Sequence, residues 1–137
     1  MEPLKISTGT ICIPVERDGE ATGVLKLTPG DVNFANRYMQ LLTAFDTKQK
    51  ELLERMGQCE ASHDKAGEVS IAAEFFAFVN GQIDYVFGEG TSAMLFGEVC
   101  TTEMYQQFFT AVTPIFQQAR SGNVERYTRQ SNGGVME

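Results

Sequence analysis

Few residues in this chain have the types and spacing that catalysis or metal binding requires. The single histidine, His63, follows Cys59 by four residues in a polar stretch. A zinc site needs further cysteine or histidine pairs at short spacing, and the other cysteines, Cys12 and Cys100, are distant in the sequence. A serine or cysteine nucleophile would also need a supported histidine, which leaves only His63. The sequence therefore favours neither a metal centre nor a histidine-dependent active site.

Carboxylates are the remaining catalytic candidates, and Asp84 and Glu89 form one acidic pair near a turn. Such pairs arise readily in a chain with 18 acidic and 11 basic side chains. A glycosidase would require one carboxyl group with a raised pKa in a cleft. The simpler interpretation of Asp84 is a hydrogen-bond acceptor at a helix end. We therefore expect a protein that is not an enzyme and that uses no cofactor.

The stretch from Gly88 to Ser92, Gly-Glu-Gly-Thr-Ser, has the composition of a phosphate-binding turn. A phosphate loop adds a lysine or arginine, and none occurs between Asp84 and Glu98. Glu89 and Glu98 would instead repel a phosphate group. Glycines also give the backbone the positive φ angles that helix ends and tight turns need. We therefore expect a structural connection between two helices here, with Thr91 or Ser92 capping a short helical turn.

Size and charge limit the classes of function. A chain of 137 residues and 15.2 kDa fits a single domain, which we place at residues 1–128, with a disordered tail at 129–137. The net charge of -7 opposes binding to nucleic acid or to an anionic membrane. No apolar run is long enough to cross a bilayer, no secretory signal opens the chain, and three cysteines suit a reducing compartment. We expect a soluble, intracellular protein without nucleic-acid or membrane partners.

Residues 1–28 have the pattern of a β-hairpin. Ile11, Ile13 and Val15 alternate on one face of a strand, and Asp18-Gly19 is a strong signal for a tight turn. Residues 24–27 then form the return strand, and Leu4–Ser7 a further short edge strand. A lone hairpin is marginally stable in water, so this one must pack on helices or pair with another subunit.

Residues 31–120 predict a helical region with three main helices, which gives a mostly helical α+β fold. Asp31 or Asn33 caps the first helix, which we expect to stop at Gly57 and to be followed by a polar loop at 57–67. The second helix covers Glu68–Phe87. Its expected core stripe comprises Val69, Ala72, Ala73, Phe76, Val79, Ile83 and Phe87, and Ile71, Phe75, Phe78 and Val86 widen it.

Thr101 or Thr102 caps the third helix, and Pro114 should kink it because proline lacks a backbone donor. All ten phenylalanines fall between Phe34 and Phe116. Three helices and a hairpin cannot easily bury both the main apolar stripes and the aromatic residues beside them. We therefore predict a partner-facing patch of surplus aromatic residues, namely Phe75, Phe78, Tyr105 and Phe109. A thicker core is the alternative.

The stretch IDYVFGEGTSAMLFGE, followed by EMYQQFFTAVTPIFQQAR, resembles the small tail assembly chaperones of tailed phages and prophages in Gram-positive hosts. That family has an Ile-Asp-x-x-Phe-Gly-x-Gly-Thr-Ser-x-x-x-Phe-Gly core before a helix with a Phe-Phe-x-x-x-x-Pro segment. The matching residues are Ile83, Asp84, Phe87, Gly88, Gly90, Thr91, Ser92, Phe96, Gly97, Phe108, Phe109 and Pro114. The resemblance covers roughly residues 24–120, and the polar stretch 57–67 and the glycine-bearing tail depart from it.

The resemblance implies a chaperone in the cytoplasm of the bacterial host that binds the tape-measure protein and shields its apolar helices. It also implies recruitment of tail-tube subunits and absence from the mature virion. Whether the protein forms a homo-oligomer stays open. Two other interpretations stay open. One is a structural minor tail or head-tail connector protein whose hairpins pair in a ring. The other is a ligand-binding domain with an apolar pocket under the 87–97 turn.

Overall fold

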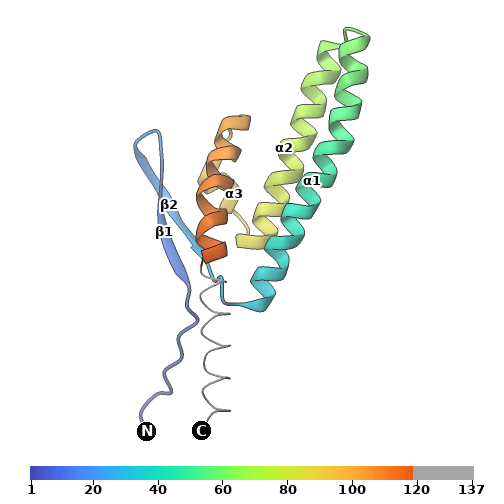
Figure 1. Cartoon of the computed structure of the whole chain (residues 1–137). Coiled ribbons are helices and arrows are strands. Elements are labelled where there is room, and N and C mark those ends of the chain that lie inside the picture. Colours follow the sequence, from blue (N-terminus) through green and yellow to red (C-terminus); the bar gives the residue numbers. More distant parts are fainter. Residues whose placement is uncertain (119–137) are drawn as a thin grey trace, which may run out of the picture.

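The computed structural model describes residues 1–118. Two antiparallel strands, β1 (Ile11–Arg17) and β2 (Glu20–Leu27), precede the helices α1 (Val32–Ala61), α2 (Lys65–Phe87) and α3 (Thr91–Phe96). Residues 102–118 form a further helix, called here the C-terminal helix. This arrangement confirms the predicted mostly helical α+β class, with a hairpin before three main helices (Figure 1). The predicted tail at 129–137 and the predicted domain end at residue 128 lie outside the described residues.

The turn of the β-hairpin lies where the sequence predicts it. Asp18 and Gly19 both have positive φ angles, 55° and 83°, as a two-residue hairpin turn requires. The strands pair from Ile11 with Leu27 to Arg17 with Glu20, and β2 is therefore longer than predicted. The predicted strand at Leu4–Ser7 is wrong, because residues 1–10 adopt no regular structure and no neighbouring strand in the described chain pairs with them.

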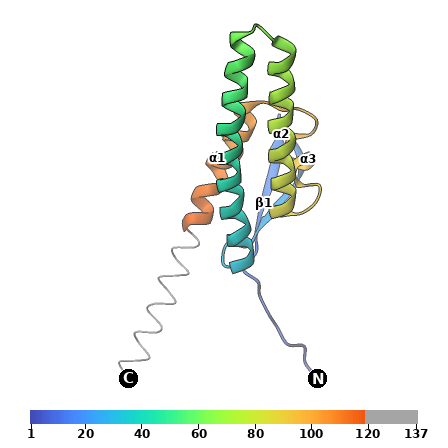
Figure 2. The same ribbon diagram turned by 90° about the vertical axis from the view of Figure 1, so that its right-hand side faces the viewer.

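The long helices α1 and α2 pack against each other in antiparallel directions, and their connected ends project beyond the rest of the molecule (Figures 1 and 2). The predicted stop at Gly57 is wrong, since α1 continues to Ala61. A single glycine costs only about 1 kcal/mol relative to alanine in a helix, and the flanking turns of α1 outweigh that cost.

A three-residue connection replaces most of the polar loop that was predicted at 57–67. Ser62 ends α1, and its Oγ donates to the carbonyl oxygen of Gln58 at 3.0 Å. His63 adopts a φ of 59°, and the Asp64 carboxylate then accepts a hydrogen bond from the Gly67 N–H at 2.9 Å. Asp64 thereby caps α2, which starts at Lys65, three residues earlier than predicted.

The buried core lies at the base of the molecule, where β2, α1, α2, α3 and the C-terminal helix meet. Tyr38 is completely buried there, and its hydroxyl group shares a 2.7 Å hydrogen bond with the Thr113 hydroxyl group. Burial raises the pKa of Tyr38, although the Thr113 contact opposes that rise. The other largest fully buried side chains are Leu27, Leu41, Val79 and Ile83.

The buried face of α2 agrees with the predicted stripe in part, since its buried residues were all predicted in the stripe or beside it. Its buried residues are Ile71, Val79, Ile83 and Val86, whereas Val69 is 70% exposed. Because the outer half of α2 projects beyond the core, it has α1 as its main neighbour, and only the face toward α1 is covered (Figure 1). A nearly continuous apolar sequence could not indicate which of its faces would be buried.

Candidate functional site

The connection between α2 and α3, residues 84–97, contains most of the residues that resemble the chaperone motif. The Asp84 Oδ1 atom accepts a hydrogen bond from the Ser92 N–H at 2.8 Å, which confirms the predicted role of Asp84 as a helix-end acceptor. Thr91 donates its hydroxyl proton to the Gly88 carbonyl oxygen at 2.7 Å. Asp84 therefore supplies the side-chain cap of α3 that was expected from Thr91 or Ser92.

The same contact explains why this turn is unsuited to phosphate. Gly88 and Gly90 have positive φ angles of 118° and 90°, and glycine adopts such angles without the steric cost of a side chain. The Ser92 N–H, which a phosphate would need, already binds the Asp84 carboxylate. An incoming anion would have to displace that negative group and approach Glu89 as well. The turn is a structural connection.

Two glycines let the hairpin approach this connection closely. Arg17 Nη1 donates to the Met94 carbonyl oxygen at 3.0 Å, and a Cβ atom at Gly97 would lie 3.1 Å from Arg17 Cζ. A Cβ atom at Gly23 would lie only 2.7 Å from Met94 Cγ. We call this set, residues 84–97 with Arg17 and Gly23, the clasp, because it fixes β1 and β2 to the helices.

Several of the remaining motif residues pack in the core. Ile83 is completely buried, and Phe87 contacts the rings of Phe34 and Phe108 with centroids 5.5 and 5.7 Å apart. Phe96 stacks on Tyr105 at 4.2 Å. Pro114 is exposed, and the helical conformation continues through it to residue 118.

A hollow of about 310 Å³ lies between α1, α2 and the C-terminal helix, and we call it the aromatic cleft. Its walls bring together the rings of Phe45, Phe75 and Phe109, one from each helix. The Phe45 ring lies 5.3 Å from each of the other two, measured between centroids. The complete lining is Leu42, Phe45, Gln49, Phe75, Phe76, Thr102, Tyr105, Gln106, Phe109 and Thr110.

Three of the four residues predicted to face a partner, Phe75, Tyr105 and Phe109, line this cleft. Phe75 and Phe109 are partly exposed, but Tyr105 is 3% exposed and is part of the supporting wall. Its hydroxyl group donates to Asn80 Oδ1, and burial raises the pKa of Tyr105 far above its ordinary value. Tyr105 is therefore not a surface residue, contrary to the prediction.

Phe78 is separated from the other predicted partner residues. It does not line the aromatic cleft, and Lys48 Nζ lies 5.6 Å from the centroid of its ring. Lys48 also lies 3.4 Å from Glu74 Oε1, so a charged group covers this ring. The cleft also contains Phe45 and Phe76, which the sequence did not indicate as partner-facing; Phe76 belonged to the predicted core stripe of the second helix.

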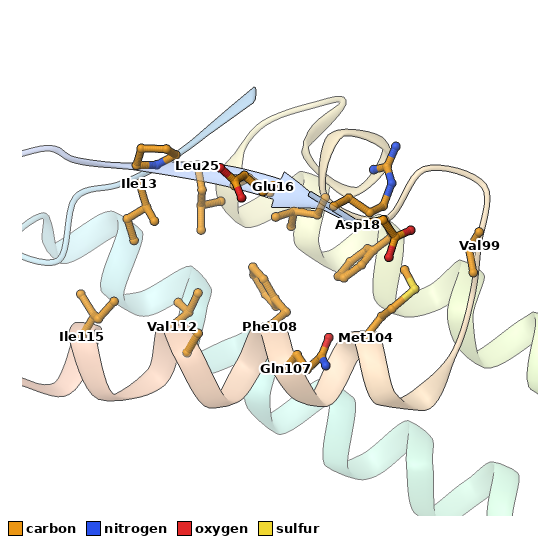
Figure 3. Close-up of a pocket in the computed structure, with 16 residues that line it drawn as sticks. Ile13, Glu16, Asp18, Leu25, Val99, Met104, Gln107, Phe108, Val112 and Ile115 are labelled. Atoms are coloured by element: carbon orange, nitrogen blue, oxygen red, sulfur yellow. The ribbon is translucent and has the colours of Figure 1, made fainter. Parts of the chain in front are cut away.

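A second hollow, of about 440 Å³, lies between β1 and the C-terminal helix, and we call it the β1 groove. Ile13 and Leu25 point from the hairpin toward Phe108 and Val112 on the helix (Figure 3). Glu16, Arg17 and Asp18 line one end. The groove also reaches Leu95 and Phe96, close to where the sequence left open a pocket under the 87–97 turn.

A family model described as a family of unknown function, DUF6673, matches residues 23–133, which is most of the chain. The chain belongs to this family. No curated protein and no solved structure matches the chain significantly. The DUF6673 description carries no activity, so the resemblance to tail assembly chaperones stays a prediction.

Within residues 1–118 of this DUF6673 protein, no group of three or more histidine, cysteine or acidic side chains is arranged to hold a metal ion. Cys12, Cys59 and Cys100 are all free thiols. None of the described helices is long and apolar enough to cross a membrane. The aromatic cleft and the β1 groove are two apolar hollows of the described surface that could bind another molecule.

Proposed function

We propose that this DUF6673 protein is a non-catalytic chaperone of phage tail assembly. In this proposal it binds an apolar helical segment of the tape-measure protein and assists assembly of the tail tube. The observation that carries the proposal is the aromatic cleft, where Phe45, Phe75 and Phe109 from three helices border one hollow of about 310 Å³. The resemblance of residues 83–116 to tail assembly chaperones supplies the identity of the cargo.

The cleft has the chemistry that an amphipathic helix requires. Partly exposed aromatic rings offer apolar surface, while Gln49, Gln106 and Thr110 provide polar groups at the border. Helices that bind in such hollows insert apolar side chains spaced three or four residues apart. A volume of about 310 Å³ is at the small end of binding pockets, so it suits a few anchoring side chains and not a whole helix.

Charge is compatible with this role. The net charge of -7 keeps a protein that carries exposed aromatic rings soluble, and it attracts cargo segments with basic residues beside their apolar faces. A chaperone of this kind acts in the cytoplasm of the bacterial host and leaves before the virion is complete.

Co-expression with the tape-measure protein of the same phage or prophage tests the proposal. We expect the tape-measure protein to be soluble only when the chaperone is present, and the two to elute together in size-exclusion chromatography with light scattering. Phe75→Ser and Phe109→Ser should abolish co-elution. Phe78→Ser is the matched control, because Phe78 is a partly buried phenylalanine of α2 that lies outside the cleft.

The proposal fails if co-elution is lost equally with Phe78→Ser, or if no co-elution occurs with the wild-type protein. Circular dichroism of each variant must show the wild-type helix content, so that loss of binding is not confused with unfolding.

A structural virion protein that forms a ring is the second candidate. The observation that favours it is the two-stranded sheet, whose outer edges pair with no other strand in residues 1–118. Such edges can pair with a neighbouring subunit. A stable closed ring that forms without cargo and that is found in purified virions would favour this candidate over the chaperone.

A further inference from the structure

We propose that the N-terminal segment of one copy of this protein docks in the β1 groove of a second copy. The segment, residues 1–10, is called here the N-terminal arm. This inference is independent of the proposed chaperone function, because it concerns a different hollow and a different partner.

The arm exposes apolar side chains in a strand-like pattern. Leu4 is 86% exposed and Ile6 is 80% exposed. Residues two positions apart in an extended chain point to the same side, so Leu4 and Ile6 form one apolar face, with Lys5 on the opposite face. The sequence predicted a strand at 4–7, and no strand lies beside it within the described chain.

The β1 groove offers a place of matching shape. Its lining includes every residue from Ile13 to Asp18, from both faces of β1, so the hollow reaches the outer edge of the strand. An extended segment beside that edge would place alternate side chains over the C-terminal helix. The groove wall from Met104 to Ile115 is about 16 Å long at 1.5 Å per helical residue. Five extended residues, such as Pro3–Ser7, span about the same length at 3.3 Å per residue.

The pattern of charge matches as well. If Leu4 and Ile6 face inward toward the apolar lining, Lys5 faces outward on the same side of the sheet as the exposed carboxylate of Glu16. Glu16 has no ion pair among the described residues, and Asp18 lies close by in the turn. Pro14 has no backbone N–H, so β1 can donate fewer hydrogen bonds to a docked segment. Burial of apolar side chains in the groove must therefore provide much of the binding.

The arm points away from the groove of its own chain. It leaves the start of β1 and runs away from the helices (Figure 1). At its base, hydroxyl groups of Thr8 and Thr10 lie 2.7 Å apart, and Thr10 contacts the Thr28 hydroxyl group at 2.9 Å. Folding back into its own groove would require a sharp reversal at these residues and the loss of those contacts. The arm can instead enter the groove of a second copy while these threonine contacts stay intact. Two copies can then exchange arms symmetrically.

Light scattering on the full-length protein, with changes in the arm and the groove, tests the proposal. We expect a mass of at least two chains, and a change to the single-chain mass of 15.2 kDa when Leu4→Ser and Ile6→Ser are combined. Ala111→Glu should have the same effect, because Ala111 is an exposed residue of the C-terminal helix that lines the groove. Ala77→Glu, on an exposed position of α2 outside the groove, is the matched control and should leave the oligomer intact.

A crosslinking experiment identifies the chain that supplies the arm. Chains in which the three native cysteines are replaced by serine carry either Ile6→Cys or Ala111→Cys, and the two are mixed and treated with a bismaleimide. The proposal expects a covalent dimer that contains one chain of each kind. A wild-type protein that stays monomeric at all concentrations, or an oligomer that persists after the arm or groove changes, would overturn it. A third chain carries both Ile6→Cys and Ala111→Cys. If this chain crosslinks only within itself, the arm fills its own groove, and the proposal is overturned.

Discussion

The clasp and the aromatic cleft both involve helices of the same small molecule. They differ in whether their side chains find partners within the chain. In the clasp, the Asp84 carboxylate, the Thr91 hydroxyl and the Arg17 guanidinium all have partners within the chain. In the cleft, Phe75 and Phe109 retain exposed surface. The glycine-rich, acidic clasp resembles a site of chemistry in the sequence, yet its groups are occupied by structural contacts. Surface that can bind a partner is found where packing is incomplete.

The adjacent residues Phe108 and Phe109 give the largest expected contrast between buried core and cleft. Phe108 is buried beneath the clasp, whereas Phe109 borders the cleft and is partly exposed. Phe108→Ala should reduce the free energy of unfolding by about 3–5 kcal/mol, as for other buried phenylalanines, and Phe109→Ala by clearly less. Urea unfolding followed by circular dichroism measures both. Equal losses would mean that the cleft is part of the core.

Two glycines test whether the clasp depends on close backbone approach. Gly97 has a φ of 64° and lies against the Arg17 side chain. Gly97→Val should destabilise the protein by about 2–3 kcal/mol through left-handed backbone strain and displacement of that guanidinium group. Gly81→Ala is the control, because it is in α2 with open space around it and should stabilise the fold by about 0.5–1 kcal/mol. Thermal unfolding checks both variants: the melting temperature should fall with Gly97→Val and rise with Gly81→Ala.

The cap supplied by Asp84 should have a smaller effect. Asp84→Ala leaves the Ser92 N–H without its acceptor and should cost about 1 kcal/mol, as for other helix caps. Asp46→Ala removes an exposed carboxylate that only pairs with Lys50 on the same helix, and it should cost less than about 0.5 kcal/mol. Urea unfolding measures both losses in the free energy of unfolding. Equal losses would mean that the Asp84 cap does not stabilise α3.

Alkaline pH should weaken the wall of the cleft and the core beside it. Burial raises the pKa of both Tyr38 and Tyr105 in the folded protein above the unfolded value of about 10. The folded state therefore holds these protons more tightly, so the contribution of the two tyrosines to stability is fully present below about pH 10 and is lost as the pH rises above it. Urea unfolding between pH 8 and 11 should show this decline. Tyr105→Phe should reduce its slope, and an unchanged slope would contradict the role of Tyr105.

Several features of the fold follow from short stretches of sequence. The Asp18-Gly19 turn is predictable because few residue pairs tolerate two positive φ angles. The cap at Asp31 is another example, since its carboxylate accepts from the Asn33 N–H at 2.9 Å, and Thr101 similarly accepts from Met104. The end of α1 was not predictable from Gly57, because continued packing along α2 outweighs one unfavourable residue.

The candidate sites were only partly predictable for a related reason. Helical spacing indicated surplus aromatic residues at Phe75 and Phe109, and the structure places both in one hollow. Helical spacing could not show that Tyr105 is buried or that Lys48 covers the ring of Phe78, because both facts depend on the neighbouring helices. The β1 groove had no sequence signal of its own, since its two walls come from opposite ends of the described chain.

The sequence by itself determined the class of the fold, its hairpin turn and its helix caps, because these depend on backbone preferences and hydrogen bonds between residues close together in the chain. Only the tertiary structure decided which apolar faces are covered and which remain open. Burial depends on contacts between distant segments, and a stripe such as that of α2 is compatible with several partners until the helices pack. The same rule applies to Leu4 and Ile6, whose pattern is that of a strand but which pair with no strand in the described chain.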